Sequence, residues 1–297
     1  MASERLENDC SVFFGTVFAI LNDEIEIIFK NDNTMDKKKI IVIPDIHGRT
    51  FWKEAVKNID DFKRVIFLGD YLDPYPFENI TVEVSISNFK EIIDFKKKHG
   101  EKVVLLLGNH DMPYFSNDYY KMNDYHCRHS RFFHNDIANL FDENRDMFKI
   151  AYVEDDILFT HAGCTSGWIQ DVFTDLYEIT TLDDLAFSLN NLLNTKEGLK
   201  YLSMVSMLRY GPDLYGSCIW SDVREMMTEH TDEKLKYLIK HIKQVFGHTL
   251  LAFEDDEGNI KYGEPIENGN MKMIDTHKAF ELDPETFTLV EIGKKEV

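Results

Sequence analysis

A carboxylate and an imidazole follow directly on an apolar run early in the chain. Residues 41–43 read Ile-Val-Ile, which predicts a buried strand, and Asp45 and His47 come just after it. Asp and His two residues apart on an extended segment project from the same side, so they can hold one divalent metal ion. A turn residue beside a polar neighbour is the alternative for such a pair taken alone.

The same arrangement occurs twice more. Each of two further apolar runs ends in a glycine followed by a metal-ligand type of residue, with Asp70 after residues 64–68 and Asn109 after residues 102–107. Glycine allows the backbone to turn sharply away from a sheet. The segments between the runs are long enough for crossover helices, which predicts parallel strands whose carboxyl ends meet at one edge.

Five short stretches together carry a resemblance to a known family. They are Asp45–Gly48, Gly69–Asp73, Gly108–Asp111, Thr160–Gly163 and Gly247–Thr249, with Trp220–Asp222 as a less specific sixth. In these stretches and their order the chain resembles the calcineurin-like metallophosphoesterases, most closely their serine/threonine phosphoprotein-phosphatase branch. The resemblance implies an α/β fold, a two-sheet mixed β-sandwich flanked by helices. It also implies metal-dependent hydrolysis of phosphoric esters.

The resemblance implies a centre of two divalent metal ions that share one carboxylate. It assigns Asp45, His47 and Asp70 to one ion, and Asp70, Asn109, His161 and His248 to the other. Carboxylate, amide oxygen and imidazole without any thiolate suit manganese, our first expectation, or iron, zinc or nickel. A hydroxide held between the two ions would attack phosphorus.

Two further residues are expected to handle the proton of the leaving alcohol. His110 follows Asn109 and is not among the assigned ligands, which leaves it available as the general acid. By resemblance, Asp73 hydrogen-bonds His110 and favours the imidazolium form. The alternative for Asp73 is a turn residue in front of Pro74.

The substrate side of the site departs from the family pattern. Many members carry Arg-Gly after the second Asp of the Gly-Asp-x-x-Asp stretch, and that Arg holds the phosphate, whereas this chain has Pro74-Tyr75. Residues 118–143 show helical spacing, with Arg128 and Arg131 three apart on the polar side. These two arginines are candidates to replace the missing clamp, and the alternative is a solvated helix face paired with Asp124 or Asn135.

Several polar residues keep open assignments. Arg49, Arg209 and Arg224 are further candidates for phosphate contact, although an Arg in the position of Arg49 is more often tied to a nearby carboxylate. His277 falls near the expected site, but no local pattern assigns it a role.

The favoured function is a phosphomonoesterase of phosphoprotein-phosphatase type, acting on a phosphoprotein or a small phosphoester. A hydrolase of nucleotides or dinucleoside polyphosphates is the alternative among enzymes, and the missing Arg-Gly keeps it open. A catalytically silent phosphate-binding module is the alternative from another class. The complete set of ligands, together with His110 and Asp73, counts against a silent module.

Composition limits the partners. The 297 residues include 33 Lys+Arg and 53 Asp+Glu, a net charge of −20, which disfavours an extended nucleic-acid groove. The apolar stretch Val12–Leu21 is too short to span a bilayer, so no membrane partner is expected. The cysteines are scattered, at 10, 127, 164 and 218, which favours a reducing compartment and predicts a cytoplasmic protein.

The spread of the matching stretches predicts one metallophosphoesterase domain over residues 1–297, with a helical insertion over about 168–208 near the site. Periodicity predicts helices over 81–98 and 232–243, a helix from Thr50 to about Asp60, and strands at 24–29 and 148–153.

Overall fold

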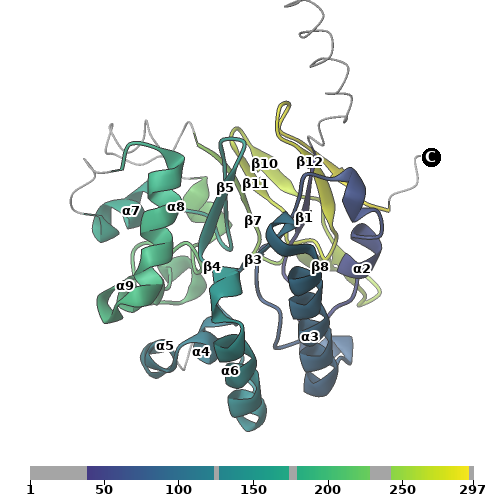
Figure 1. Cartoon of the computed structure of the whole chain (residues 1–297), viewed down its shortest axis with the longest axis horizontal. Helices are drawn as coiled ribbons and strands as arrows, with labels where there is room; N and C mark the ends of the chain where they lie inside the picture. The colour runs from purple at the N-terminus through teal and green to yellow at the C-terminus, as the bar shows by residue number, and fades with distance from the viewer. Residues whose placement is uncertain (1–38, 124–126, 174–178, 228–241, 294–297) are drawn as a thin grey trace, which may run out of the picture. The chain divides into compact units, whose positions relative to one another are not determined.

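A six-stranded mixed sheet carries the first three loops of interest. The computed structural model describes residues 39–123, 127–173, 179–227 and 242–293 (Figure 1). The strands run in the order β13-β12-β1-β2-β3-β4. Strands β1 to β4 are parallel to one another, whereas β12 is antiparallel to both of its neighbours, β1 and β13. The strands are β1 (Ile40–Ile43), β2 (Arg64–Phe67), β3 (Val103–Leu106), β4 (Phe148–Lys149), β12 (Phe280–Asp283) and β13 (Thr288–Glu291).

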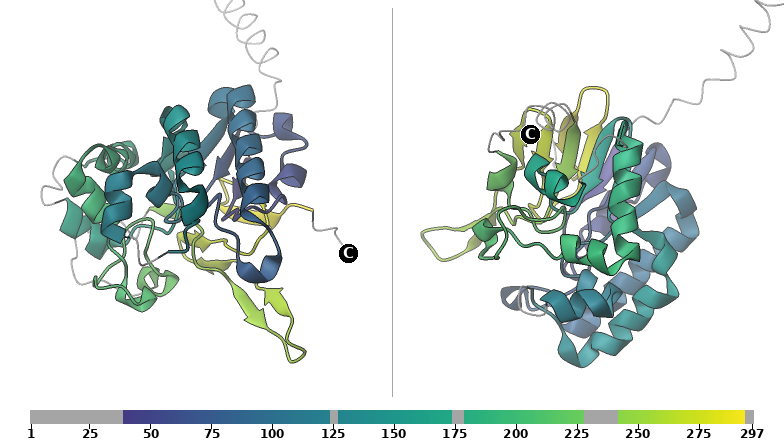
Figure 2. Two further views of the ribbon diagram at one scale, coloured as in Figure 1. Left: turned by 90° about the horizontal axis from the view of Figure 1, so that it is seen from below. Right: turned by 90° about the vertical axis from the view of Figure 1, so that its left-hand side faces the viewer.

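A second mixed sheet carries the remaining two loops. Its order is β10-β11-β7-β6-β5, with β11, β7 and β6 parallel and the two edge strands antiparallel. The strands are β5 (Ala151–Glu154), β6 (Ile157–Thr160), β7 (Lys243–Phe246), β10 (Ile266–Asn268) and β11 (Met271–Met273). A separate hairpin of β8 (Ala252–Glu254) and β9 (Ile260–Tyr262) projects away from both sheets in Figure 2.

The two sheets face each other across an apolar core. Because side chains alternate along a strand, one set from β1 to β3 points to the second sheet and the other set points outward. Val42, Ile66 and Leu106 pack with Phe159 and Val245 of the second sheet. The opposite set, which includes Ile43 and Phe67, packs under helices. This arrangement confirms the predicted sandwich flanked by helices, and it explains why these strands are apolar along their whole length.

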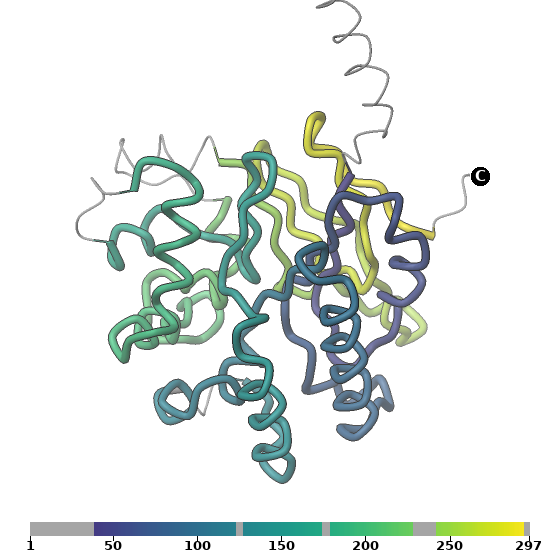
Figure 3. Tube along the Cα trace, viewed as in Figure 1, coloured from purple at the N-terminus to yellow at the C-terminus, as the bar shows by residue number. Residues whose placement is uncertain are grey.

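Helices cover the outer face of the first sheet (Figures 1 and 3). The long helix α3 (Val82–His99) matches its prediction and begins at Thr81, whose side chain accepts a hydrogen bond from the backbone N–H of Val84. The other helices are α2 (Trp52–Ala55), α4 (Met112–Phe115), α5 (Asn117–Asn123), α6 (His134–Glu143), α7 (Ser166–Val172), α8 (Leu182–Asn191), α9 (Lys196–Leu202) and α10 (Val223–Met226). Helices therefore do form in the 168–208 region.

Three predicted elements are wrong in detail. The helix expected over 118–143 is divided into α5, a 3-10 turn at Arg131–Phe133 and α6, and residues 127–130 are not helical. The strand expected over 148–153 is two strands that belong to different sheets, since β4 pairs with β3 and β5 pairs with β6. The helix expected from Thr50 is only one turn, α2, and no side chain caps it.

The described residues all belong to one compact unit. The strand predicted at 24–29 and most of the helix predicted over 232–243 lie outside the described residues, so these predictions and the single-domain prediction over 1–297 remain predictions.

Candidate active site

The polar residues predicted from the sequence follow the carboxyl ends of five parallel strands. Asp45 and His47 follow β1, Asp70 follows β2, Asn109 and His110 follow β3, His161 follows β6, and His248 follows β7. All seven residues are at most 8 % exposed. His47, Asp70 and His248 have positive φ angles of 43°, 53° and 69°, a conformation uncommon for residues other than glycine. Such strain at non-glycine residues is typical of functional sites.

Glycines let two carboxylates approach the backbone closely. A Cβ at Gly108 would lie 2.1 Å from Oδ1 of Asp70, and a Cβ at Gly247 would lie 2.3 Å from Oδ1 of Asp45. In return, the backbone N–H of His110 donates to Oδ1 of Asp70 at 2.9 Å. The backbone N–H of His248 donates to Oδ1 of Asp45 at 3.0 Å. Neither position tolerates a side chain while the carboxylate stays in place.

One group of possible metal ligands joins the two sheets. The ligand atoms of Asp70, His161 and His248 all lie within 4.8 Å of one another. Nδ1 of His161 lies 2.9 Å from the carbonyl of Leu68, so it must carry the hydrogen. Nε2 of His161 therefore presents its lone pair, 3.0 Å from Oδ1 of Asn109 and 3.0 Å from Nδ1 of His248. The lone pair of His161 thus faces the oxygen of Asn109 with no hydrogen between them, an arrangement that a cation would satisfy.

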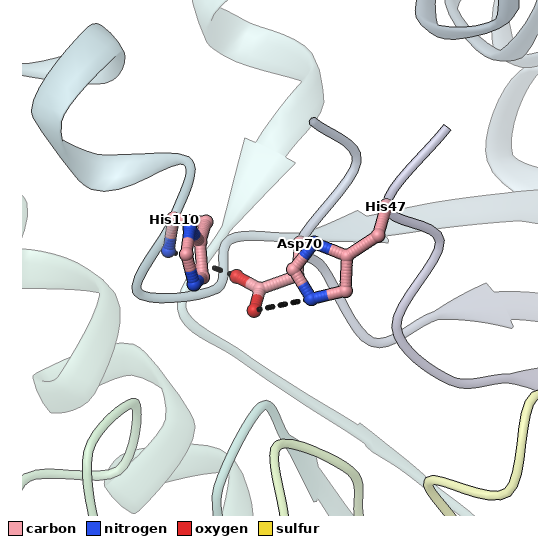
Figure 4. A group of neighbouring side chains, drawn as sticks. All are labelled: His47, Asp70 and His110. Atoms are coloured by element: carbon pink, nitrogen blue, oxygen red, sulfur yellow. Dashed lines mark hydrogen bonds and ion pairs between the residues drawn. The ribbon is translucent and has the colours of Figure 1, made fainter. Parts of the chain in front are cut away.

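A second group shares Asp70 with the first. The ligand atoms of His47, Asp70 and His110 also lie within 4.8 Å of one another, and Figure 4 shows the Asp70 carboxylate between the two imidazoles. Nδ1 of His47 lies 2.7 Å from the carbonyl of Leu72 and must donate to it. Nε2 of His47 therefore faces Oδ2 of Asp70, at 3.5 Å. Histidines that ligate metals commonly donate their other ring nitrogen to a carbonyl in this way.

Asp45 lies beside these groups rather than within them. Neither group of mutually close ligand atoms includes Asp45. Its carboxylate is buried and lies close enough to His161 for the two charges to interact. Asp45 is thus brought to the centre, while its placement as a ligand remains a prediction.

Burial and neighbouring charges set the protonation states. Burial would raise the pKa of Asp70, but the three surrounding imidazoles, above all that of His161, lower it to about 2. Burial lowers the pKa of His47 and of His248 well below the usual value for histidine. The site therefore presents an ionised Asp70 carboxylate and neutral imidazoles at His47 and His248, the forms that bind metal ions.

His110 and Asp73 lie together at the edge of the centre. Nδ1 of His110 is 3.0 Å from the carbonyl of Arg128 and 3.5 Å from Oδ2 of Asp73. The hydroxyls of Tyr114 and Ser130 donate to Oδ1 of Asp73, at 2.8 and 3.0 Å. The carboxylate is thus oriented by two residues that no sequence pattern had singled out.

Asp111 holds two of the loops together through backbone hydrogen bonds. It is fully buried, and its carboxylate accepts hydrogen bonds from the backbone N–H groups of Asp70, Tyr71 and Gly108, at 2.7 to 3.0 Å. Asp111 therefore connects the loop after β2 to the loop after β3, which fixes the position of Asp70.

The arginines differ in their relation to the centre. The guanidinium carbon of Arg128 lies 4.0 Å from the centre of the Tyr75 ring, and its Nη2 donates to the carbonyl of Asp73 at 3.2 Å. Arg131 is exposed on the 3-10 turn before α6, so the two residues do not share a helical face as predicted. Arg209 donates to the hydroxyl of Thr249 at 2.6 Å and to the carbonyl of His248 at 3.4 Å.

Two other candidate arginines are held by carboxylates. Nε of Arg49 donates to Glu78 at 2.7 Å. Nε of Arg224 donates to Asp222 at 2.7 Å, and the Arg224 side chain is 62 % exposed.

The fold and the shared carboxylate are those of a metal-dependent phosphoesterase, and comparison with known families agrees. A family model described as calcineurin-like phosphoesterase matches residues 38–251. The chain therefore belongs to the calcineurin-like phosphoesterase family and is a phosphoric ester hydrolase. No curated protein sequence matches the chain. None of the helices in the described part of the chain has the length and apolar character needed to cross a bilayer.

Proposed function

We propose that this chain hydrolyses phosphomonoesters at a centre of two divalent metal ions that share the carboxylate of Asp70. One observation carries the proposal: two groups of buried ligand atoms have Asp70 in common. In each group, a histidine donates one ring nitrogen to a backbone carbonyl and turns the other toward that carboxylate.

The donor set fits such a centre. Imidazole, carboxylate and amide oxygen without a thiolate suit manganese, the metal we propose, and also iron, zinc or nickel. We assign Asp45, His47 and Asp70 to one ion, and Asp70, Asn109, His161 and His248 to the other. Bound divalent ions supply a water of lowered pKa as the nucleophile and positive charge for the phosphoryl oxygens.

The protein itself would handle the proton and the orientation of the ester. We assign His110 as the general acid that protonates the departing alcohol, because it lies beside Asp70 and our ligand assignment has Asp45 in its place in the second group. Asp73, 3.5 Å from its Nδ1, stabilises the imidazolium form. Tyr114 and Ser130 keep Asp73 in that position.

We assign Arg128 to contact the phosphoryl group. It would take the role of the Arg that many family members carry where this chain has Pro74-Tyr75. Nε of Arg128 is buried and, within the described residues, has no hydrogen-bond partner. Stacking on Tyr75 orients the guanidinium. We also assign Arg209, which donates to the carbonyl of His248, to the same phosphoryl group. A role for Arg131 remains a prediction, and its exposure makes it the weaker of the original pair.

The resemblance to the phosphoprotein-phosphatase branch covers the metal-binding loops, so the type of phosphomonoester is a separate proposal. A phosphopeptide, a nucleotide and a small sugar phosphate are the classes to compare. The free thiols at Cys164 and Cys218 support a reducing, cytoplasmic location.

Hydrolysis of a chromogenic phosphomonoester by metal-free protein, with and without added Mn²⁺, tests the proposal. We expect activity only with metal, and its loss in Asp70→Asn with the fold retained by circular dichroism. Asp146→Asn, on an exposed turn before β4, is the matched control and should keep full activity. Absence of hydrolysis with Mn²⁺, Fe²⁺, Zn²⁺ and Ni²⁺ would reject the enzyme and favour a phosphate-binding module.

A further inference from the structure

A second set of buried polar side chains lies beside the metal loops and is not used in the proposed reaction. This set, the Glu78 cluster, consists of Arg49, Glu78, Asp275 and His277. Nε of Arg49 donates to Oε1 of Glu78 at 2.7 Å, and Nδ1 of His277 lies 3.6 Å from the same oxygen. Asp275 is 1 % exposed, and the other three side chains are 7 to 11 % exposed.

Each member of the cluster has a buried polar atom without a partner. The atoms are Arg49 Nη2, Glu78 Oε2, Asp275 Oδ1 and His277 Nε2, four of the nine such side-chain atoms found among the described residues. Buried polar atoms in proteins almost always have a hydrogen-bond partner. Their concentration in one place indicates a partner that is not part of the chain.

The cluster adjoins the candidate active site. Nη1 of Arg49 donates to the carbonyl of Asp45 at 3.0 Å. The ring of Tyr75 packs edge-on against His47 at 5.0 Å and lies 6.4 Å from the ring of His277. The alcohol portion of a substrate can therefore reach the cluster while its phosphoryl group lies at the metal loops.

The chemistry of the cluster favours a neutral polar group. The charges of Arg49 and Glu78 cancel, while burial raises the pKa of Asp275 and lowers that of His277 to about 3, so both are held neutral. The unpartnered atoms include a donor and acceptors, which a hydroxyl satisfies because it both donates and accepts. A second phosphate would face Glu78 and is disfavoured.

Aromatic rings lie beside the Glu78 cluster. The ring of Tyr262, from β9, lies 4.0 Å from that of His277, and Tyr75 lies on the side toward His47. Such rings provide the apolar wall that a sugar ring packs against, with polar groups fixing its hydroxyls.

We propose that the Glu78 cluster binds vicinal hydroxyls on the alcohol portion of the substrate, which makes this chain a phosphomonoesterase for sugar or nucleoside phosphates. The inference rests on the proposed function and names its substrate class. It separates such esters from phosphopeptides, which lack the diol.

The test compares ribose 5-phosphate with propyl phosphate, which has no hydroxyl, on metal-loaded protein. His277→Gly removes one unpartnered atom, and the φ of 58° at this position suits glycine, so the variant should fold. We expect kcat/KM for ribose 5-phosphate to fall about tenfold, the effect of one lost hydrogen bond, with propyl phosphate unchanged. Asp156→Gly, at an exposed turn with φ 58°, is the matched control and should change neither.

A second variant and a second pair of substrates complete the test. Glu78→Gln keeps an oxygen that accepts from Arg49. It should again lower kcat/KM only for substrates that carry a diol. Adenosine 5′-monophosphate against ribose 5-phosphate distinguishes a nucleoside from a free sugar as the source of the diol. Equal kcat/KM for ribose 5-phosphate and propyl phosphate in the unchanged protein would overturn the inference, as would equal losses for both substrates in His277→Gly.

Failure of the inference is distinguishable from failure of the proposed function. If no phosphoester is hydrolysed, the proposed function fails, and calorimetry then compares binding of ribose 5-phosphate and propyl phosphate. Tighter binding of ribose 5-phosphate, weakened in His277→Gly, would support the cluster as a diol site. Equal binding would reject it.

Discussion

Replacing Gly108 with alanine tests whether the position of Asp70 controls the site. The new Cβ would lie 2.1 Å from Oδ1 of Asp70 and 2.8 Å from its backbone nitrogen. Since ordinary non-bonded contacts are about 3.5 Å, the carboxylate must move by roughly 1 Å. The φ of Gly108 lies outside the left-handed region, so alanine adds no strain of its own and the steric effect is isolated.

The size of the effect follows from that displacement. A misplacement of about 1 Å in a catalytic group costs roughly 100-fold in rate, so we expect kcat/KM for a chromogenic phosphomonoester to fall by about that factor. Overpacking should also lower the free energy of unfolding by about 1–3 kcal/mol. Calorimetric titration with Mn²⁺ should show weaker binding, because Asp70 belongs to both ligand groups.

Gly263→Ala is the matched control. Its Cβ would have its nearest neighbours, two atoms of Leu251, at 3.7 Å, which is ordinary contact. Activity, metal binding and denaturant unfolding should therefore match those of the unchanged protein. The reasoning is refuted if Gly108→Ala binds metal and turns over substrate as well as Gly263→Ala does.

Three further predictions concern individual side chains. His110→Asn should lower kcat about 10²–10⁴-fold for an alkyl phosphate. The loss should be much smaller for an aryl phosphate, whose leaving group needs no proton. Equal losses of kcat for the two esters would contradict the role of His110 as general acid. Arg128→Gln should lower kcat/KM at least about tenfold, more than Arg131→Gln does. Equal values of kcat/KM for the unchanged protein and both variants would show that Arg128 does not contact the substrate. Burial opposes ionisation of Glu154, but hydrogen bonds from Arg64 and Lys63 lower its pKa to about 2. The ionised form therefore stabilises the fold above pH about 4.5, and this stability is lost as the pH falls toward about 2. Glu154→Gln should flatten the pH dependence of unfolding in this interval, and an unchanged slope would show that the ion pairs contribute nothing.

The sequence identified the site because its residues follow apolar strands in a repeated pattern. Asp70, Asn109 and His161 each come directly after a buried strand, and parallel strands bring their carboxyl ends to the same edge. A local pattern thus implied a contact between residues far apart in the chain.

The supporting interactions could not be read in the same way. Asp111, Tyr114 and Ser130 act through hydrogen bonds to groups in other loops, and single residues of these types occur in any turn. Helical spacing over 118–143 was also misleading. Tyr119 of α5 and Phe141 of α6 do lie in the core, but residues 127–130 are not helical and Arg128 lies against Tyr75. Tertiary contacts override periodicity at this point.

The Glu78 cluster shows a different limit of sequence reasoning. Its members come from the loop after β1, the turn before α3 and the segment after β11, and none of them belongs to a recognisable pattern. The sequence offered Arg49 and His277 as separate candidates, and only the burial and the unpartnered atoms of all four residues identify them as a cluster.

The most direct test of the account is the number of metal ions bound by the purified protein, measured by calorimetry and elemental analysis after removal of metal and titration with Mn²⁺. The account predicts two ions per chain, and the loss of both from Asp70→Asn because the two ligand groups share this carboxylate. Protein that binds no ion, or an Asp70→Asn variant that still binds two, would contradict it.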